Sequence, residues 1–315
     1  MSLHRLRRSL WVAAACAATA LPASAQLRAD GPAVPLFADD AAALQPVWSP
    51  DGERLAFTRE GYVGLWTVTA AGDGVRQLSD EPGAGFGFAW SPDGRAIAAR
   101  VARLDGIRRQ DAIKRFGVDG GASVLIDYAA ATPSLPVWFD AYRVGVVLEG
   151  ELATRLTADA PRLAPLQGEA VLGAGPDGVR VADLGTRSLA ALTPVDGQLL
   201  NATPSPDGQR VAFEVVGGNL YVMDRDGANV VDLGVGHRPA WSPDGRWVVF
   251  MTTQDDGYAF TAADLVAARA DGSARVALTA TPDRLEMNPS WSPDGRMVAF
   301  DDAADGALYL LPVTE

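Results

Sequence analysis

The chain has 315 residues, and 48% of them are hydrophobic, which is enough for a large core. The formal net charge of −12 excludes nucleic acid as a partner, because an acidic surface repels phosphate. The same charge disfavours binding to anionic membranes. Glycine (33 residues) and proline (21 residues) are frequent, as a fold with many tight turns requires. All-β folds of this length are commonly single units, although two domains would also fit.

The first 25 residues have the features of a secretory signal peptide. Three arginines precede an alanine-rich apolar run over residues 10–21, and residues 23–25 (Ala-Ser-Ala) match a signal-peptidase site. We therefore expect residues 1–25 to be removed by cleavage after Ala25, which leaves a periplasmic or secreted protein. A membrane anchor is one alternative, but the apolar run is too short to span a bilayer comfortably. Lipidation at Cys16 is another.

Cleavage changes both the charge and the cysteine content of the chain. It removes three of the 27 basic residues and no acidic residue, so 24 basic residues face 39 acidic ones, a formal charge of about −15. Cys16 is the only cysteine, so the mature chain has neither a disulfide nor a thiolate metal site. No later apolar stretch reaches the roughly 18 residues of a transmembrane helix, and we expect no membrane span after cleavage.

A five-residue motif, Trp-Ser-Pro-Asp-Gly, recurs along the chain. It stands at residues 48–52, 90–94, 241–245 and 291–295, and residues 204–208 repeat it with proline in place of tryptophan. Each copy is followed by a short apolar segment such as Val-Ala-Phe, then by a third apolar segment, a glycine turn and a fourth segment that ends on leucine. One unit is thus expected to form four antiparallel strands, the size of one propeller blade.

Turn chemistry explains the composition of the motif. Proline presets φ for a type I turn, aspartate tolerates the next position, and glycine takes the left-handed conformation that closes the hairpin. The tryptophan is expected to pack between neighbouring blades, where a buried indole removes roughly 200 Å² from water. A structural role explains all five motif aspartates at once, and we prefer it to a catalytic role.

The repeats predict one all-β propeller over residues 26–315. Five units are clear, and residues 136–200, where the motif decays, fit two short units better than one enlarged unit. Seven four-stranded blades are therefore favoured, with six as the alternative. The last unit lacks a fourth strand, and Val34–Phe37 supplies a candidate. Leu36 lies 12 residues before Trp48, the same interval that separates the fourth-strand leucine Leu78 from Trp90. We expect this N-terminal strand to complete the C-terminal blade and so remove an exposed sheet edge.

The motif and its downstream Val-Ala-Phe segment resemble the TolB-type propeller repeat, which also occurs in the propeller domains of prolyl oligopeptidase-like peptidases. The resemblance covers nearly all of residues 34–315, with residues 136–200 diverged, and it implies the propeller fold. It implies little about function, because one fold hosts many functions. We expect a propeller without the α/β domain that precedes it in TolB and without the hydrolase domain of the peptidases. The sequence contains no Gly-x-Ser-x-Gly elbow.

Few residues suit catalysis or metal binding. His237, the only histidine after residue 25, has no obvious nucleophile nearby, so a solvated turn histidine is preferred to a triad base. Zinc is nearly excluded for want of ligands. Three acid pairs leave calcium open, but none forms a spaced calcium loop, and a solvated acidic surface is preferred; the pairs are Asp39-Asp40, Asp255-Asp256 and Asp301-Asp302. We predict no resident cofactor, with calcium as the alternative.

A better site candidate is defined by position. In a propeller, the segment that enters the innermost strand of each blade lies near one mouth of the central channel. The residue three places before the motif, or its equivalent, is Gln45, Gly87, Leu135, Asn201, Arg238 and Asn288 in successive units. The polar members, together with His237, predict a ring that binds a peptide segment or a small polar ligand. A solvated ring of loops is the alternative.

The sequence thus favours an exported, non-catalytic propeller scaffold that binds a protein or peptide of the cell envelope at the channel mouth. The alternative is a propeller enzyme of the lactonase, hydrolase or lyase kind. Its site would be lined by carboxylates in the channel and would depend on calcium if calcium binds.

Overall fold

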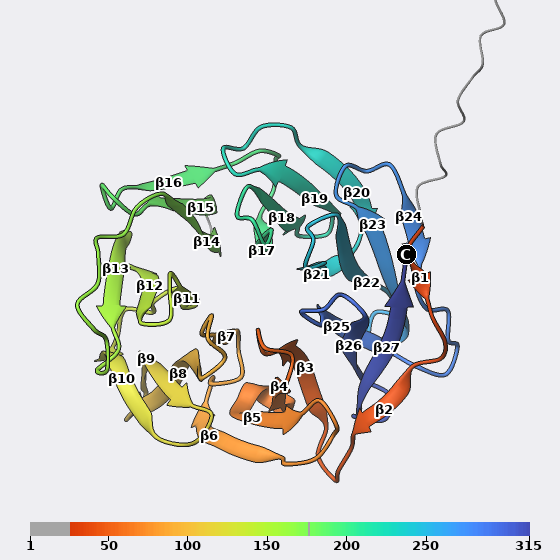
Figure 1. The fold of residues 1–315 in the computed structure, drawn as a ribbon, viewed down its shortest axis with the longest axis horizontal. Coiled ribbons are helices and arrows are strands. Elements are labelled where there is room, and N and C mark those ends of the chain that lie inside the picture. Colours follow the sequence, from red (N-terminus) through yellow and green to blue (C-terminus); the bar gives the residue numbers. More distant parts are fainter. Residues whose placement is uncertain (1–25, 176) are drawn as a thin grey trace, which may run out of the picture.

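The computed structural model describes residues 26–175 and 177–315, which form a ring of seven antiparallel β-sheets around a central channel (Figure 1). Within these residues the helical structure is one 3₁₀ turn, Glu60–Tyr62. The all-β, seven-bladed prediction is confirmed, and the six-bladed alternative is wrong. The predicted signal peptide lies outside the described residues. No helix in the described part of the chain has the length and apolarity needed to cross a membrane.

The blades follow one another in chain order, and the innermost strand of each is its first. Blade 1 contains β3 (Ala43–Trp48), β4 (Arg54–Arg59), β5 (Val63–Thr69) and β6 (Arg76–Pro82). Blade 2 contains β7 (Ala89–Trp90), β8 (Ala96–Asp105), β9 (Arg108–Gly117) and β10 (Ala122–Ala129). The diverged region forms two short blades of three strands each: β11 (Val137–Trp138), β12 (Arg143–Leu148) and β13 (Glu151–Leu156) in blade 3, and β14 (Glu169–Gly175), β15 (Gly178–Asp183) and β16 (Leu189–Leu192) in blade 4.

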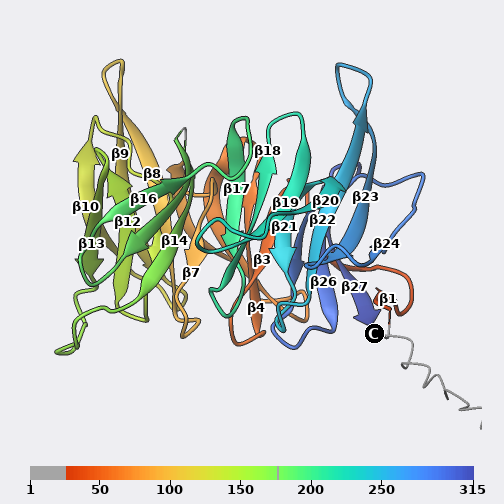
Figure 2. The same ribbon diagram turned by 90° about the horizontal axis from the view of Figure 1, so that it is seen from above.

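The second half of the ring is more regular. Blade 5 contains β17 (Leu199–Pro204), β18 (Arg210–Val215), β19 (Asn219–Asp224) and β20 (Val231–Val235). Blade 6 contains β21 (His237–Trp241), β22 (Trp247–Asp255), β23 (Phe260–Arg269) and β24 (Arg275–Ala277). Blade 7 contains β25 (Glu286–Trp291), β26 (Met297–Asp302) and β27 (Leu308–Thr314). The hairpins β8–β9 and β22–β23 rise above the other blades on one face of the ring (Figure 2).

The N-terminal segment closes the ring, as predicted. Strand β2 (Val34–Phe37) pairs antiparallel with β27, with Val34 opposite Leu310 (Figure 1). Strand β1 (Arg28–Ala29) pairs with the other end of β27, an addition that the sequence did not reveal. The outer edge of the last blade is therefore covered by the first residues of the described chain, which protects it from pairing with another molecule.

The motif turns have the structural role expected of them. In the first copy, Asp51 accepts hydrogen bonds from the Ser49 hydroxyl (2.6 Å) and from the Glu53 backbone N–H (3.0 Å). The other four copies repeat the bond from serine to aspartate at 2.6 Å. In the fifth copy, the Ser292 hydroxyl lowers the pKa of Asp294, as expected for a carboxylate held by a donor. The motif aspartates are therefore committed to their own turns.

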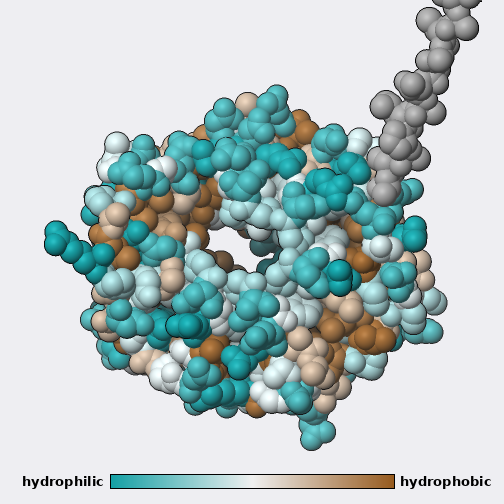
Figure 3. Space-filling view, in the orientation of Figure 1, coloured by the Kyte–Doolittle hydropathy of each residue, from teal (hydrophilic) through white to brown (hydrophobic). Residues whose placement is uncertain are grey.

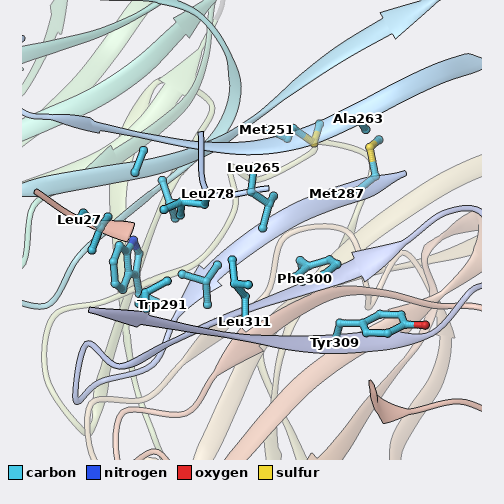
Figure 4. Close-up of a cluster of buried hydrophobic side chains, with 14 of the residues drawn as sticks. Leu27, Met251, Ala263, Leu265, Leu278, Met287, Trp291, Phe300, Tyr309 and Leu311 are labelled. Carbon is cyan, nitrogen blue, oxygen red and sulfur yellow. The ribbon is translucent and has the colours of Figure 1, made fainter. Parts of the chain in front are cut away.

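The motif tryptophans pack between blades. Trp90 lies in one buried cluster with Ala56 and Leu65 of blade 1 and with Ile97 of blade 2. Its indole N–H donates to the carbonyl oxygen of Val47, on the innermost strand of the preceding blade, at 3.1 Å. The tryptophans at positions 138 and 241 repeat this bond. Figure 4 shows the cluster between blades 6 and 7, where the motif indole of blade 7 packs with apolar side chains of both blades.

Candidate functional site

The predicted ring residues line one cavity of the central channel, which opens at the centre of the molecule (Figure 3). A cavity of about 530 Å³ is lined there by residues from six blades, including all six predicted positions: Gln45, Gly87, Leu135, Asn201, Arg238 and Asn288. The rest of the lining is mainly apolar, with four prolines and the side chains of Val47, Trp241 and Trp291. Arg238 is the one charged residue among those that line the cavity.

The four polar lining residues at these positions, called the mouth ring below, share a left-handed backbone. Their φ angles are 55° at Gln45, 49° at Asn201, 56° at Arg238 and 49° at Asn288, and Gly87 has φ of 69°. Positive φ is uncommon outside glycine and is tolerated mainly by asparagine and aspartate. Glutamine and arginine therefore occupy these positions at a conformational cost.

A β-bulge produces this conformation in each blade concerned. The pairing of the innermost strand with the second strand shifts register at the mouth-ring residue, for example between Leu44 and Val47 in β3. The same shift recurs in β17, β21 and β25. Bulges redirect a side chain and interrupt the hydrogen-bond ladder. In three of the four cases the next residue is proline, which has no N–H to leave unpaired.

Buried carboxylates hold these bulges in place. Asp301 on β26 accepts from the side-chain amide of Asn288 in its own blade (2.9 Å) and from the backbone N–H of Gln45 in the next blade (2.9 Å). Glu214 on β18 accepts in the same way from the Asn201 amide (2.6 Å) and from the Arg238 backbone N–H (2.5 Å). Each carboxylate thus ties together the bulges of two neighbouring blades.

Two other blade junctions are tied from the same position of the second strand by different chemistry. The Sδ atom of Met251 on β22 accepts from the Asn288 backbone N–H at 3.4 Å. The Arg100 guanidinium on β8 donates to the Pro133 carbonyl oxygen, in the segment that enters blade 3, at 2.8 Å. This position was not among those predicted from the sequence. A comparison of the repeats would have found it, because it follows the apolar second-strand triplet in each unit.

Burial changes the ionisation of Asp301. It is only 1% exposed, and burial raises its pKa to about 7. The hydrogen bonds from Asn288 and Gln45 and the positive charge of Arg238 oppose this shift. The carboxyl group behind the mouth therefore gains and loses its charge near neutral pH.

The contacts divide the mouth ring into two kinds of residue. Asn201 and Asn288 each donate an amide N–H to a buried carboxylate. Their side chains therefore belong to the set of bulges and buried carboxylates described above, which is called the frame below. The side chains of Gln45 and Arg238 make no hydrogen bond within the described residues. These two are therefore the mouth-ring side chains whose polar groups the frame does not use.

His237 departs from the prediction. It is the first residue of β21 and does not sit in a solvated turn, so that interpretation is wrong. Its side chain is 33% exposed, and its Nδ1 lies 3.2 Å from an oxygen of Glu214. The reason is the neighbouring blade, whose second strand carries Glu214 against the start of β21. His237 lies beside the mouth ring but does not line the cavity.

The acid pairs also differ from one another. Asp301 and Asp302 are each 1% exposed, so the solvated-surface interpretation is wrong for this pair. Asp302 accepts from the backbone N–H of Leu285 at 2.9 Å. The pairs Asp39-Asp40 and Asp255-Asp256 are exposed, as expected. Among residues 26–175 and 177–315, no group of three or more histidine, cysteine, aspartate or glutamate side chains is placed to hold a metal ion. The calcium alternative stays a prediction.

Comparison with known proteins adds solved structures only. No protein-family model and no curated protein match the chain. The putative TolB from Agrobacterium tumefaciens matches with a TM-score of 0.53 and 19% identity, over 87% of this chain and 91% of that one. The gluconolactonase XC5397 from Xanthomonas campestris matches with a TM-score of 0.56 and 18% identity, over 90% of this chain and 89% of that one. U3-55K matches with a TM-score of 0.64 and 11% identity, over 89% of this chain and 98% of that one. The likeness is one of fold. At such low sequence identities, a shared fold does not indicate a shared activity.

Proposed function

We propose that this chain is an exported, non-catalytic propeller that binds a protein or peptide segment at the channel mouth. The observation that carries the proposal is the mouth ring, where polar side chains from four blades converge on one cavity in a left-handed conformation. Gly87 shows that the frame accepts glycine at this position. Strained backbone held in place by surrounding structure is a feature of binding sites.

The chemistry of the mouth supports binding more than catalysis. Arg238 is the one charged lining residue, and the nearby acids Glu214 and Asp301 are buried and bonded to the bulges. His237, the one histidine among the described residues, has its Nδ1 against an oxygen of Glu214. A cavity of this size with apolar walls and a few convergent polar groups is the common form of a ligand site.

Export rests on the N-terminal sequence features, and the partner is accordingly proposed to belong to the cell envelope. Mass spectrometry of the secreted or periplasmic protein should give Gln26 as its first residue. An intact Met1 on the cell-associated protein would contradict export by cleavage.

Capture of a partner from envelope extract tests the function. The immobilised propeller is compared with the double variant Gln45→Ala, Arg238→Gln, which changes the two mouth-ring side chains that the frame does not use. Arg95→Gln is the matched control, since Arg95 is exposed in a motif turn at the other end of an innermost strand. We expect wild type and control to retain the same protein and the double variant to lose it. Equal capture by all three would show that the mouth is not the binding site.

A further inference from the structure

The Arg238 guanidinium lies in unusual surroundings. It is half-buried among uncharged lining residues, and no acceptor in the described chain is within hydrogen-bond distance of it. A guanidinium that loses water to apolar walls normally gains a carboxylate or carbonyl partner within the protein. Arg100, for comparison, is bonded to a carbonyl oxygen. The frame therefore leaves a cation at the mouth without a counter-ion bonded to it.

The nearby acids do not take this role. Glu214 is 5% exposed, and its oxygens face the Asn201 amide, the Arg238 backbone N–H and the His237 ring. Asp301 lies close enough for the Arg238 charge to lower its pKa, yet burial still holds that pKa at about 7, so much of this carboxyl is neutral at neutral pH. Neither acid lines the cavity.

Gln45 supplies a second unused donor to the cavity that Arg238 lines. Its backbone N–H is bonded to Asp301, and the positive charge of Arg238 lowers the pKa of the same carboxyl group. A planar guanidinium fork matches a carboxylate with two parallel hydrogen bonds, and a neighbouring amide N–H adds a third.

Resting on the proposed function, we propose that the mouth recognises a carboxylate of its peptide ligand, and specifically the C-terminal carboxylate, held by Arg238 and the Gln45 side-chain amide. The cavity of about 530 Å³ is in the range of pockets that enclose small ligands, roughly 300–1,000 Å³. It therefore accepts a chain end more readily than a side chain on a folded surface. The prolines and indoles of the wall would contact the apolar part of the last residues.

Three pools of random hexapeptides test this inference on the folded propeller. The first pool has free C-termini and no internal acids, the second is the same pool with amidated C-termini, and the third is amidated but contains internal aspartate and glutamate. Each pool is passed over immobilised wild type, Arg238→Gln, Arg238→Lys and the Arg95→Gln control, and retained peptides are quantified by mass spectrometry. Circular dichroism confirms that each variant is folded.

We expect wild type and Arg95→Gln to enrich the free-acid pool roughly tenfold or more over its amidated twin, the effect of one charge-assisted pair. Arg238→Gln should lose this preference, and Arg238→Lys should keep only part of it because lysine lacks the fork. Equal enrichment of acid and amide peptides would overturn the inference and leave the proposed function standing. Enrichment of the third pool alone would overturn the C-terminal assignment. No enrichment from any pool would overturn the chain-end inference, and envelope capture then judges the proposed function separately.

Discussion

The mouth ring divides into residues whose side chains bond to buried carboxylates and residues whose side chains form no hydrogen bond, and this division predicts opposite responses to substitution. Arg238→Gly removes a side chain that the frame does not use, at a position where glycine is conformationally favoured. Asn288→Ala removes an amide that is bonded to a buried carboxylate and leaves alanine in a left-handed conformation. Both residues occupy the same place in the repeat, so each variant is the control of the other.

The magnitudes follow from the contacts. Left-handed backbone costs a non-glycine residue about 1–2 kcal/mol, whereas glycine loses about 0.5–1 kcal/mol through the greater freedom of the unfolded chain. Arg238→Gly should thus change the free energy of unfolding by less than about 1 kcal/mol, with stabilisation the favoured sign. Asn288→Ala loses a hydrogen bond to a charged group, about 1.5–3 kcal/mol, and gains left-handed strain, so a loss of roughly 2–4 kcal/mol is expected.

Thermal unfolding followed by circular dichroism at pH 8, where Asp301 is mainly ionised, measures both effects. For a domain of this size about 1 kcal/mol corresponds to roughly 2 °C, so Asn288→Ala should lower the Tm by roughly 4–8 °C and Arg238→Gly should leave it within about 2 °C of wild type. A loss of Tm in Arg238→Gly as large as that in Asn288→Ala would refute the reasoning. Arg238 would then belong to the frame, and its proposed binding role would lose its basis.

Three further outcomes test other parts of the structure. The pKa of Asp301 is raised from 3.8 to about 7, so the stability this group contributes is complete below pH 3.8 and is lost as the pH rises through 7; between pH 5 and pH 8 the loss is roughly 2–3 kcal/mol. Asp301→Asn should flatten this dependence in urea unfolding, and an unchanged slope would contradict the assignment. Deletion of residues 26–37 uncovers the edge of β27, and size-exclusion chromatography should show larger species for the deletion variant than for the intact chain. Equal sizes and an unchanged Tm would argue against closure by these strands. Trp90→Phe removes an indole bond to a carbonyl oxygen, whereas the Trp291 indole N–H has no partner in the described residues, so Trp90→Phe should lose about 1 kcal/mol more than Trp291→Phe by denaturant unfolding. Equal losses would mean that the bond contributes nothing.

Much of the fold was predictable because the repeat encodes it locally. The motif turn fixes each hairpin through one hydroxyl and one carboxylate, and the tryptophan before it fills the junction with the preceding blade. Both signals are short-range and recur at nearly even spacing, so the blade count and the closing strand follow from counting. The diverged region also yielded two blades, although its strands lack the motif and each sheet stops at three.

The candidate site was predictable in position but not in chemistry. Counting back from the first residue of each motif copy, or of its diverged equivalent, found the six positions that line the cavity, because the register of the innermost strand is fixed by its turn. The locking partners Glu214 and Asp301 come from the second strand, and the bonds that matter cross from one blade to the next. These bonds between blades depend on how the ring closes, and a local sequence pattern does not predict that. For the same reason His237, which reads as a turn residue, is found against a carboxylate of its neighbour.

This distinction decides how the mouth ring should be interpreted. Polarity alone placed Asn201, Asn288, Gln45 and Arg238 in one class. The structure gives each asparagine a reason to be there that needs no ligand: asparagine tolerates the left-handed backbone, and its amide satisfies a buried carboxylate. Neither reason applies to Gln45, and Arg238 contributes only its positive charge, which lowers the pKa of Asp301. They occupy the same costly conformation with φ of 56° and 55°, and their side chains give the frame no hydrogen bond in return. Glycine would relieve the left-handed strain at both positions, so the proposed ligand gives the long polar side chains there a reason that the protein's own hydrogen bonds do not.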